Sequence, residues 1–377
     1  MWFLQLNTFI GIVAMGLVLI ITSLFSRVSA SMRLIIMALM SVLFIGWVDI
    51  RLLAFYLAYV AMVYVFARII CILKNARTVV FASCIVLCIL PFVAVRMIPV
   101  GHFVFIIGLA FALLRGVDTL FYSYYTGEKV SLLAFFNFMM FVPTFTAGPV
   151  FRFRDFDRAC KTFTKLTFAD FVEAIKRIIR GLFKTIVVVH VFMQVFGHFS
   201  AEGGSINLPV SFLLIVCSYL ILYFNLDGYS DIAIAVGRLY GFIVPENFKQ
   251  PWCAASFTQF WRSWHRTVSD WIREHVFILL HNKKLGRWQS AGAMVVVMAV
   301  MGLWHDFSIP VVLVATFYLG GLLAVENILG LSAPKRKWTA LRVIRCLSVN
   351  FLFGVNTLIF ITDIYTVQSI IRGFFRF

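Results

Sequence analysis

The chain consists mainly of apolar segments separated by short polar links. A membrane-spanning helix needs about 20 apolar residues, because each residue advances the helix by about 1.5 Å and the hydrocarbon layer is about 30 Å thick. Apolar runs near this length recur along the chain, at residues 3–25, 34–48, 52–67, 79–95, 98–114, 208–223, 290–304, 309–327 and 346–361, and a further apolar stretch ends at residue 196. The pattern predicts an all-α polytopic membrane protein.

Composition agrees with a membrane location. Of the 377 residues, 62% are hydrophobic and only 13% are charged, whereas soluble domains contain about 25% charged residues. No segment is polar enough for a separate soluble domain, so we expect one domain, with N-terminal spans at 1–118, a motif-bearing core at 119–330, and a C-terminal span and tail at 331–377. Residues 1–7 lack the basic start and cleavage site of a signal peptide, so a retained first helix is expected.

The formal net charge of +17 comes from 33 Lys and Arg against 16 Asp and Glu. The basic residues lie in the links between apolar runs, where positive-inside topology and anionic lipid account for them, so we expect no nucleic-acid partner. Links 26–33 and 68–77 are predicted to be cytoplasmic, which places the N-terminus on the extracytoplasmic side. The predicted location is the cytoplasmic (inner) membrane, crossed many times.

The seven cysteines are odd in number, and no pair has C-x-x-C spacing. This pattern predicts neither a disulfide framework nor a metal site. Cys84 and Cys88, one helical turn apart, are expected to be packing residues.

Three segments depart from a simple span. Segment 131–147 is apolar but contains Pro143 and is flanked by basic residues, which favours a re-entrant or surface segment. Thr167-Phe-Ala-Asp170 has the pattern of a capping box and precedes an amphipathic helix with a basic face. Residues 260–280 are predicted to form one helix, with a tryptophan face and an arginine face that suit the lipid headgroup region.

Polar and ionisable residues are dense between residues 225 and 306. The stretch contains Asn225-Leu-Asp-Gly-Tyr-Ser-Asp231, Pro245-Glu-Asn247, Phe260-Trp-Arg-Ser-Trp-His265 and Met301-Gly-Leu-Trp-His-Asp306. A charged group near the bilayer centre costs a few kcal/mol, so such groups usually face a cavity and act there. We therefore expect a hydrophilic reaction site inside the membrane.

Two histidines are candidates for proton transfer. His305 ends an apolar helix, and a neutral imidazole there can take a proton from a hydroxyl. A histidine hydrogen-bonded for structure, or one at a lipid interface, gives the same pattern. Asp306 is adjacent to His305 and does not face it on a helix, so no dyad is assigned. His265 fits a second base, a hydrogen-bond donor to a carbonyl, or an interfacial residue.

The carboxylates of Asp227 and Asp231 are four residues apart and share a helix face. Three roles stay open for them. They can bind a cation, relay protons as in a transporter, or cap a helix and pair with arginines.

The motifs together resemble those of the membrane-bound O-acyltransferase family, in the bacterial branch with alginate O-acetylases and the D-alanyl transfer proteins of teichoic acid. The resemblance covers about residues 120–330 and rests on Ala147-Gly-Pro149 with Arg152 and Phe153, Gly228-Tyr-Ser-Asp-Ile-Ala233, Pro245-Glu-Asn-Phe248, Phe260-Trp-Arg-Ser-Trp-His265 and Gly302-Leu-Trp-His305. Asn225 stands where related sequences usually have aspartate, and Asp227 where they have a small residue.

The resemblance implies a ring of about 9–11 tilted transmembrane helices, with re-entrant and interfacial helices, around a central tunnel. It identifies His305 as the catalytic histidine and His265 as the second histidine near the tunnel. The other implied substrate-binding residues are Trp264, Asn247, Tyr229, Asp231, Trp304, Arg262 and Arg266. Trp264, His265 or Asn247 would stabilise the oxyanion, and Arg262 and Arg266 would meet an acidic donor.

The implied function is acyl transfer, of a D-alanyl or acetyl group, from a cytoplasmic thioester to a hydroxyl of an extracytoplasmic envelope glycopolymer or an intermediate acceptor. The donor would be a phosphopantetheinyl acyl carrier protein or acyl-CoA, with no bound cofactor. An accessory extracytoplasmic transferase is a possible partner outside. The alternatives are a secondary transporter or flippase with an Asp/His proton relay, although no paired repeats are present, and a structural scaffold. The chain is shorter than typical members of the alginate O-acetylase type, which favours the D-alanyl type.

Overall fold

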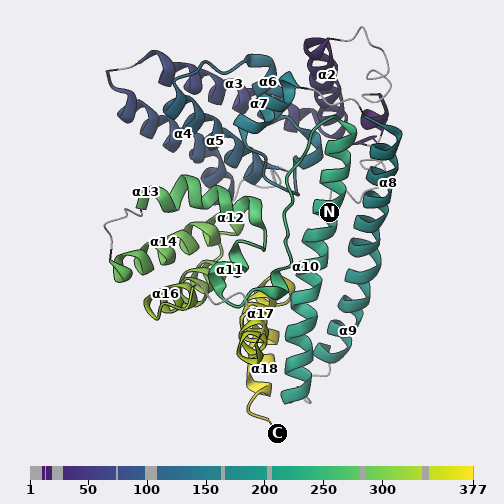
Figure 1. The fold of residues 1–377 in the computed structure, drawn as a ribbon, viewed down its shortest axis with the longest axis vertical. Coiled ribbons are helices and arrows are strands. Elements are labelled where there is room, and N and C mark those ends of the chain that lie inside the picture. The colour runs from purple at the N-terminus through teal and green to yellow at the C-terminus, as the bar shows by residue number, and fades with distance from the viewer. Residues whose placement is uncertain are drawn as a thin grey trace. The chain divides into compact units, whose positions relative to one another are not determined.

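The computed structural model describes residues 11–12, 14–18, 29–73, 75–97, 108–162, 166–201, 206–280, 286–332 and 339–376. Within these ranges the regular structure is helical, with no β-strand (Figure 1). The predicted first span, residues 3–25, and residues 98–107 of another span lie largely outside the described residues. The apolar runs within the described residues thus form helices.

Eight described helices are long and apolar enough to cross a membrane. They are Ala30–Val48 (α2), Ile50–Ile72 (α3), Arg77–Met97 (α4), Phe168–Ala201 (α8 and α9), Leu208–Leu239 (α10), Arg287–His305 (α14), Ile309–Ile328 (α15 and α16) and Ala340–Ile361 (α17). The prediction of an all-α polytopic membrane protein is confirmed.

The chain divides into two compact units. The first comprises Met1–Ile179 and Asp231–Pro245, and the second comprises Arg180–Ser230 and Glu246–Phe377. Most of the predicted site residues belong to the second unit, whereas Asp231 belongs to the first.

In the first unit, α3 packs against α4 and against α5 (Leu109–Thr126). Segment 131–147 is interrupted: α6 has only eight residues, Leu132–Met139, and a 3-10 turn follows at Val142–Thr144. The predicted re-entrant or surface placement of this segment stays a prediction. The buried guanidinium of Arg115 donates hydrogen bonds to the carbonyl oxygens of Met139 (2.9 Å) and Thr144 (2.5 Å). These bonds satisfy backbone groups that the broken helix leaves unpaired. The short helix α7 (Phe153–Lys161) comes next along the chain.

The predicted capping box begins α8 (Phe168–Leu182). Thr167 Oγ1 accepts a hydrogen bond from Asp170 N at 3.1 Å, and Asp170 Oδ2 accepts one from Thr167 N at 3.0 Å. Through a π-helical turn at Phe183–Val188 the helix continues into α9 (Val189–Ala201). Helix α10 also runs farther than its apolar pattern predicts, so the polar stretch after Asn225 is helical as far as Leu239.

In the second unit, α14 packs along α16 (Gly320–Ile328) and the π-helical turn Val314–Leu319 before it. Gly302 makes this close approach possible, because a Cβ at that position would lie 2.9 Å from the Cβ of Ala315. The motif glycine therefore fixes the end of α14, where Trp304 and His305 follow. The last helix is α18 (Ile364–Gly373).

The prediction of one helix over residues 260–280 is wrong. The structure has α11 at Phe257–Trp261, α12 at Arg266–Ile272, a π-helical turn at Arg273–Phe277 and α13 at Ile278–Leu280. The tryptophan face packs inside the protein, because Trp264 and Trp271 are buried; its level in the membrane stays a prediction. The apolar residues keep a helical spacing across the break, so the sequence pattern does not indicate that the helix is interrupted.

Candidate functional site

His265 lies at the break between α11 and α12 with a left-handed backbone. Its φ is +41° and its side chain is 8% exposed. A residue with a Cβ rarely adopts this backbone conformation. Such strained residues persist where the surrounding structure holds them, often at active sites. His265 is thus a strained residue at the break between α11 and α12.

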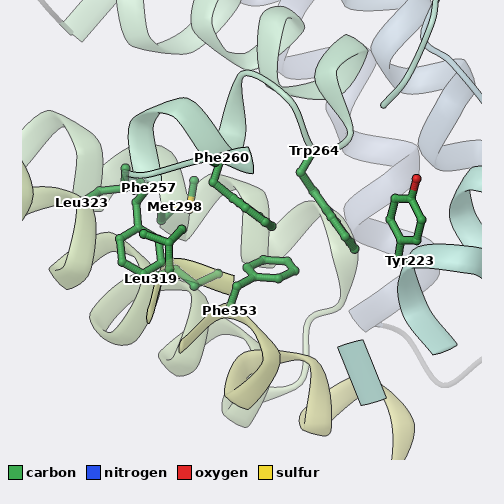
Figure 2. Packing of buried hydrophobic residues seen from close by; sticks show 10 residues of the cluster. Tyr223, Phe257, Phe260, Trp264, Met298, Leu319, Leu323 and Phe353 are labelled. Carbon is green, nitrogen blue, oxygen red and sulfur yellow. The ribbon is translucent and has the colours of Figure 1, made fainter. Parts of the chain in front are cut away.

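An aromatic cluster encloses Trp264, the residue before His265. Figure 2 shows Phe260, Trp264 and Phe353 together. The Trp264 ring stacks on Phe260 at a centroid distance of 5.4 Å, lies 4.8 Å from Phe353 and meets Phe248 edge-on at 5.2 Å. Trp264 is 3% exposed, so its substrate-binding role stays a prediction, and in this structure it anchors the chain next to His265.

The ring of Trp304 lies beside both candidate histidines. Its centroid is 6.4 Å from the His265 ring, edge to face, and 4.7 Å from the His305 ring. Trp304 is partly buried, and His305, the last residue of α14, is exposed. The structure thus brings a buried and an exposed imidazole to a common aromatic neighbour within the second unit.

Burial, and to a smaller extent the charge of His305, lower the pKa of His265 to about 3. The imidazole of His265 is therefore neutral at physiological pH. Its Nδ1 atom is buried and has no hydrogen-bond partner. A buried polar atom of this kind calls for an explanation, and a ligand group that pairs with it is one.

Asn247 uses its amide within the protein. Its Nδ2 donates to Ser230 Oγ at 3.0 Å, and its Oδ1 accepts from Thr267 Oγ1 at 2.9 Å. The predicted role of Asn247 in stabilising an oxyanion stays untested, but the amide already joins α10 to α12.

The remaining predicted site residues differ in access. Tyr229 is buried on α10, whereas Arg262 is exposed. Arg266 is partly exposed, and its Nε is 3.9 Å from a carboxylate oxygen of Asp270. The guanidinium groups of Arg262 and Arg266 are thus accessible, and their contact with an acidic donor stays a prediction.

The two aspartates of α10 are both ion-paired. In the first unit, Asp231 Oδ1 accepts a hydrogen bond from Arg177 Nε at 2.8 Å, and the Asp231 side chain is 5% exposed. In the second unit, Asp227 pairs with Lys184. Of the three roles left open by the sequence, pairing with basic residues is the one present. Asp306 accepts a hydrogen bond from Ser308 N at 3.2 Å after the helix end.

Sequence reasoning missed Glu326 on α16. This buried carboxylate accepts hydrogen bonds from Phe257 N and, at 3.0 Å, from Thr258 N, as well as from Thr258 Oγ1 at 2.7 Å. It therefore holds the first turn of α11, which begins at Phe257, eight residues before His265. A lone acidic residue within an apolar span was the signal available in the sequence.

Among the described residues, no three His, Cys, Asp or Glu side chains gather in a way that would hold a metal ion. The polar groups of the site in the second unit are instead two imidazoles, the Asn247 amide and two accessible guanidinium groups. Such a set suits proton transfer from a hydroxyl and binding of an anionic donor.

Comparison with known proteins agrees with the resemblance seen in the motifs. A model of the membrane-bound O-acyltransferase family matches residues 122–361. The chain is 30% identical over 245 residues to a probable alginate O-acetylase of Pseudomonas fluorescens, covering 64% of this chain and 48% of that protein. It is 32% identical over 195 residues to a teichoic acid D-alanyltransferase of Streptococcus thermophilus, covering 48% and 47%.

A peptidoglycan O-acetyltransferase of Helicobacter pylori is 28% identical over 197 residues, which cover 49% of this chain and 34% of that protein. The chain spans about half the length of the curated relatives that it matches first. The matched region contains all nine predicted site residues.

Proposed function

We propose a function from one premise: the chain belongs to the membrane-bound O-acyltransferase family. The proposed activity is transfer of a short acyl group, acetyl or D-alanyl, from a thioester to a hydroxyl of a cell-envelope polymer. The relatives named as alginate or peptidoglycan O-acetyltransferases and as a teichoic acid D-alanyltransferase support this substrate class.

His305 is the proposed general base. Its imidazole takes the proton of the acceptor hydroxyl as the oxygen attacks the thioester carbonyl, and the same proton then passes to the departing thiolate. The C–O bond of an ester forms and the C–S bond of the thioester breaks, so no further energy source is needed. The observation that supports this role best is the exposed position of His305 beside Trp304, which also contacts His265.

His265 is proposed to bind the reacting carbonyl as a neutral imidazole. One ring nitrogen, protonated in the matching tautomer, would donate a hydrogen bond to the oxygen on which negative charge develops. Removal of one such donor typically costs about 2.7–4 kcal/mol of transition-state stabilisation. The unpartnered, buried Nδ1 supports a role in which the ring pairs with a ligand.

The proposed donor approaches from the cytoplasm and is acyl-CoA or an acylated phosphopantetheinyl carrier protein. The exposed Arg262 and the partly exposed Arg266 would attract its phosphates or acidic surface. The acceptor, an envelope polymer or an accessory extracytoplasmic transferase, would approach from the other side. We place the protein in the cytoplasmic membrane with an extracytoplasmic N-terminus, the orientation that the basic links 26–33 and 68–77 favour.

A transporter with an Asp/His proton relay has less support. Asp227 and Asp231, the carboxylates that it needs, are ion-paired with Lys184 and Arg177. Each carboxylate would have to leave its basic partner before it could serve a relay.

Histidine substitution tests the acyltransferase proposal. The full chain and its His305→Ala and His305→Gln variants would be produced in bacteria, and alkali-labile acetate and D-alanine on envelope polymers would be measured by mass spectrometry. We expect ester formation with the wild type and a loss of at least 100-fold with both variants. His190→Ala, at an exposed position on α9, is the matched control. Undiminished esterification by the His305 variants at equal protein levels would overturn the proposal.

A further inference from the structure

The segment Asn247–Lys249 holds the strained turn around His265 at both ends. Lys249 N donates to Ser263 O at 2.9 Å, two residues before His265. Arg266 N donates to Asn247 O at 2.8 Å, directly after it. Helices α11 and α12 also bond to this turn, since Phe260 O accepts from Ser263 N and Trp264 N, and His265 O accepts from Val268 N and Ser269 N. The bonds from Asn247 and Lys249 add a support that comes from outside both helices.

The side chain of Asn247 extends this support to two helices. Its Oδ1 accepts from Thr267 Oγ1 at 2.9 Å and from Thr267 N at 3.4 Å, in the first turn of α12. Its Nδ2 donates to Ser230 Oγ on α10, and that hydroxyl in turn donates to Leu226 O at 2.8 Å. Asn247 is 2% exposed and Thr267 is 7% exposed. Buried, satisfied hydrogen bonds of this kind fix a single local geometry.

The direction of the His265 ring depends on this support. A left-handed backbone at a residue with a Cβ relaxes to an ordinary conformation unless its neighbours prevent it. Such a relaxation would swing the Cα–Cβ bond and move the ring away from Trp304, whose centroid now lies 6.4 Å away. The hydrogen bonds of Asn247 reach Arg266 and Thr267, the two residues that follow His265.

We infer that Asn247, together with Thr267, is a positioning residue that keeps the imidazole of His265 in the reactive geometry. Asn247 acts through the turn 263–267 and does not itself contact the acyl group. This inference rests on the proposed function of His265 and replaces the expectation that Asn247 donates to the oxyanion. A shift of about 1 Å in a reacting group can lower a rate about 100-fold.

Kinetics of four variants separate the two roles of Asn247. The proposal predicts that Asn247→Ala and Thr267→Val each lower kcat 10- to 100-fold with KM within about threefold, and that Thr267→Ser, which keeps the hydroxyl, restores most of kcat. It also predicts that the double variant is no slower than the slower single one, because both changes break one unit. The assay would follow thiol release from acetyl-CoA or from D-alanyl carrier protein by the detergent-purified full chain.

A second measurement does not depend on transfer activity. Diethyl pyrocarbonate modifies accessible imidazole nitrogens, and mass spectrometry of the peptide with His265 gives the rate. The buried ring should react slowly in the wild type, and at least tenfold faster in Asn247→Ala and Thr267→Val. If the wild type transfers no acyl group, the proposed function fails, while this reaction still tests the positioning role.

One substitution away from the turn is the matched control. Thr357→Val removes the hydrogen bond to Gly354 O and the one shared with Ser218 Oγ. It should leave kcat and the modification rate of His265 within about twofold of the wild type. If Asn247→Ala does not accumulate, Thr267→Val and Thr267→Ser still decide the matter. Wild-type kcat in Thr267→Val, multiplicative losses in the double variant, or an unchanged modification rate would each overturn the inference.

Discussion

His265 and Trp304 meet edge to face, with ring centroids 6.4 Å apart and ring planes at 89°. Trp304 also contacts the ring of His305 at 4.7 Å. His265 follows α11 and His305 ends α14, so the two imidazoles come from segments 40 positions apart in the sequence. The indole of Trp304 is the packing element that these two segments share.

Replacement of Trp304 should therefore disturb both histidines at once. Trp304→Ala is expected to lower kcat for acyl transfer about 10- to 100-fold, because loss of the shared ring lets both imidazoles shift. Trp304→Phe keeps an aromatic face and should recover a large part of the rate. Thiol release by the purified variants measures the effect. Trp252→Ala, an exposed tryptophan of the same unit, should retain wild-type kcat, and equal losses at both tryptophans would contradict the prediction.

The pKa of His265 predicts how stability depends on pH. Burial lowers this pKa to about 3, so below pH about 6.5 the unfolded chain binds a proton there and the folded chain does not. The folded state should therefore lose stability as pH falls from 6.5 toward 3, by up to about 1.4 kcal/mol per pH unit from this group.

Thermal unfolding of the detergent-purified protein between pH 7 and pH 5 measures this dependence. His265→Gln should show a shallower loss of melting temperature on acidification than the wild type. His190→Gln, at an exposed position, should keep the wild-type slope. An identical slope in all three proteins would show that His265 does not remain neutral in the folded state.

Glu326→Ala should destabilise the second unit. The carboxylate accepts from Phe257 N, Thr258 N and Thr258 Oγ1, and its removal leaves buried donors unpaired at a cost of about 1–3 kcal/mol each. Thermal unfolding measures this effect, and the midpoint of Glu326→Ala should be lower than that of the wild type whether or not a substrate is bound. Glu173→Ala removes an exposed pair with Lys176, which typically contributes about 0–1 kcal/mol. Equal effects of the two substitutions would contradict the role of Glu326 in capping α11.

Local patterns in the sequence predict the helices and the capping box, because these depend on neighbouring residues. The apolar run 34–48 becomes α2, and Thr167 and Asp170 form the expected reciprocal bonds. The break at His265 was not predicted, because Trp264 and Val268 keep a helical spacing across it. Part of its support is nonlocal: besides bonds within α11 and α12, the break is held by hydrogen bonds with Asn247 and Lys249.

The same distinction applies to the site. Short motifs identify His265, Trp304 and His305, which the structure brings together. They give no sign that Glu326, 69 positions after Phe257, caps α11. They also do not predict which basic residue pairs with Asp227, since Lys184 lies 43 positions earlier. Pairing between distant segments depends on the packing of whole helices, which spacing along one segment does not encode.

Lys184 and Asp227 provide a test between the acyltransferase and transporter hypotheses. Their side chains are 19% and 16% exposed. Asp227→Asn alone leaves a largely buried ammonium without its charged partner, so we expect a loss on the order of 2 kcal/mol, between the values typical of exposed and buried pairs. Lys184→Gln combined with Asp227→Asn removes both charges and should recover much of that stability.

Acyl transfer should follow stability in these variants. The double variant is expected to esterify the acceptor at a rate within about threefold of the wild type, because the Asp227 carboxylate takes no part in proton transfer in the proposed mechanism. A proton relay through Asp227 predicts instead that the double variant folds but is inactive. The exposed pair Glu173 and Lys176 gives the matched control, for which the corresponding double-mutant cycle should yield a coupling energy near zero.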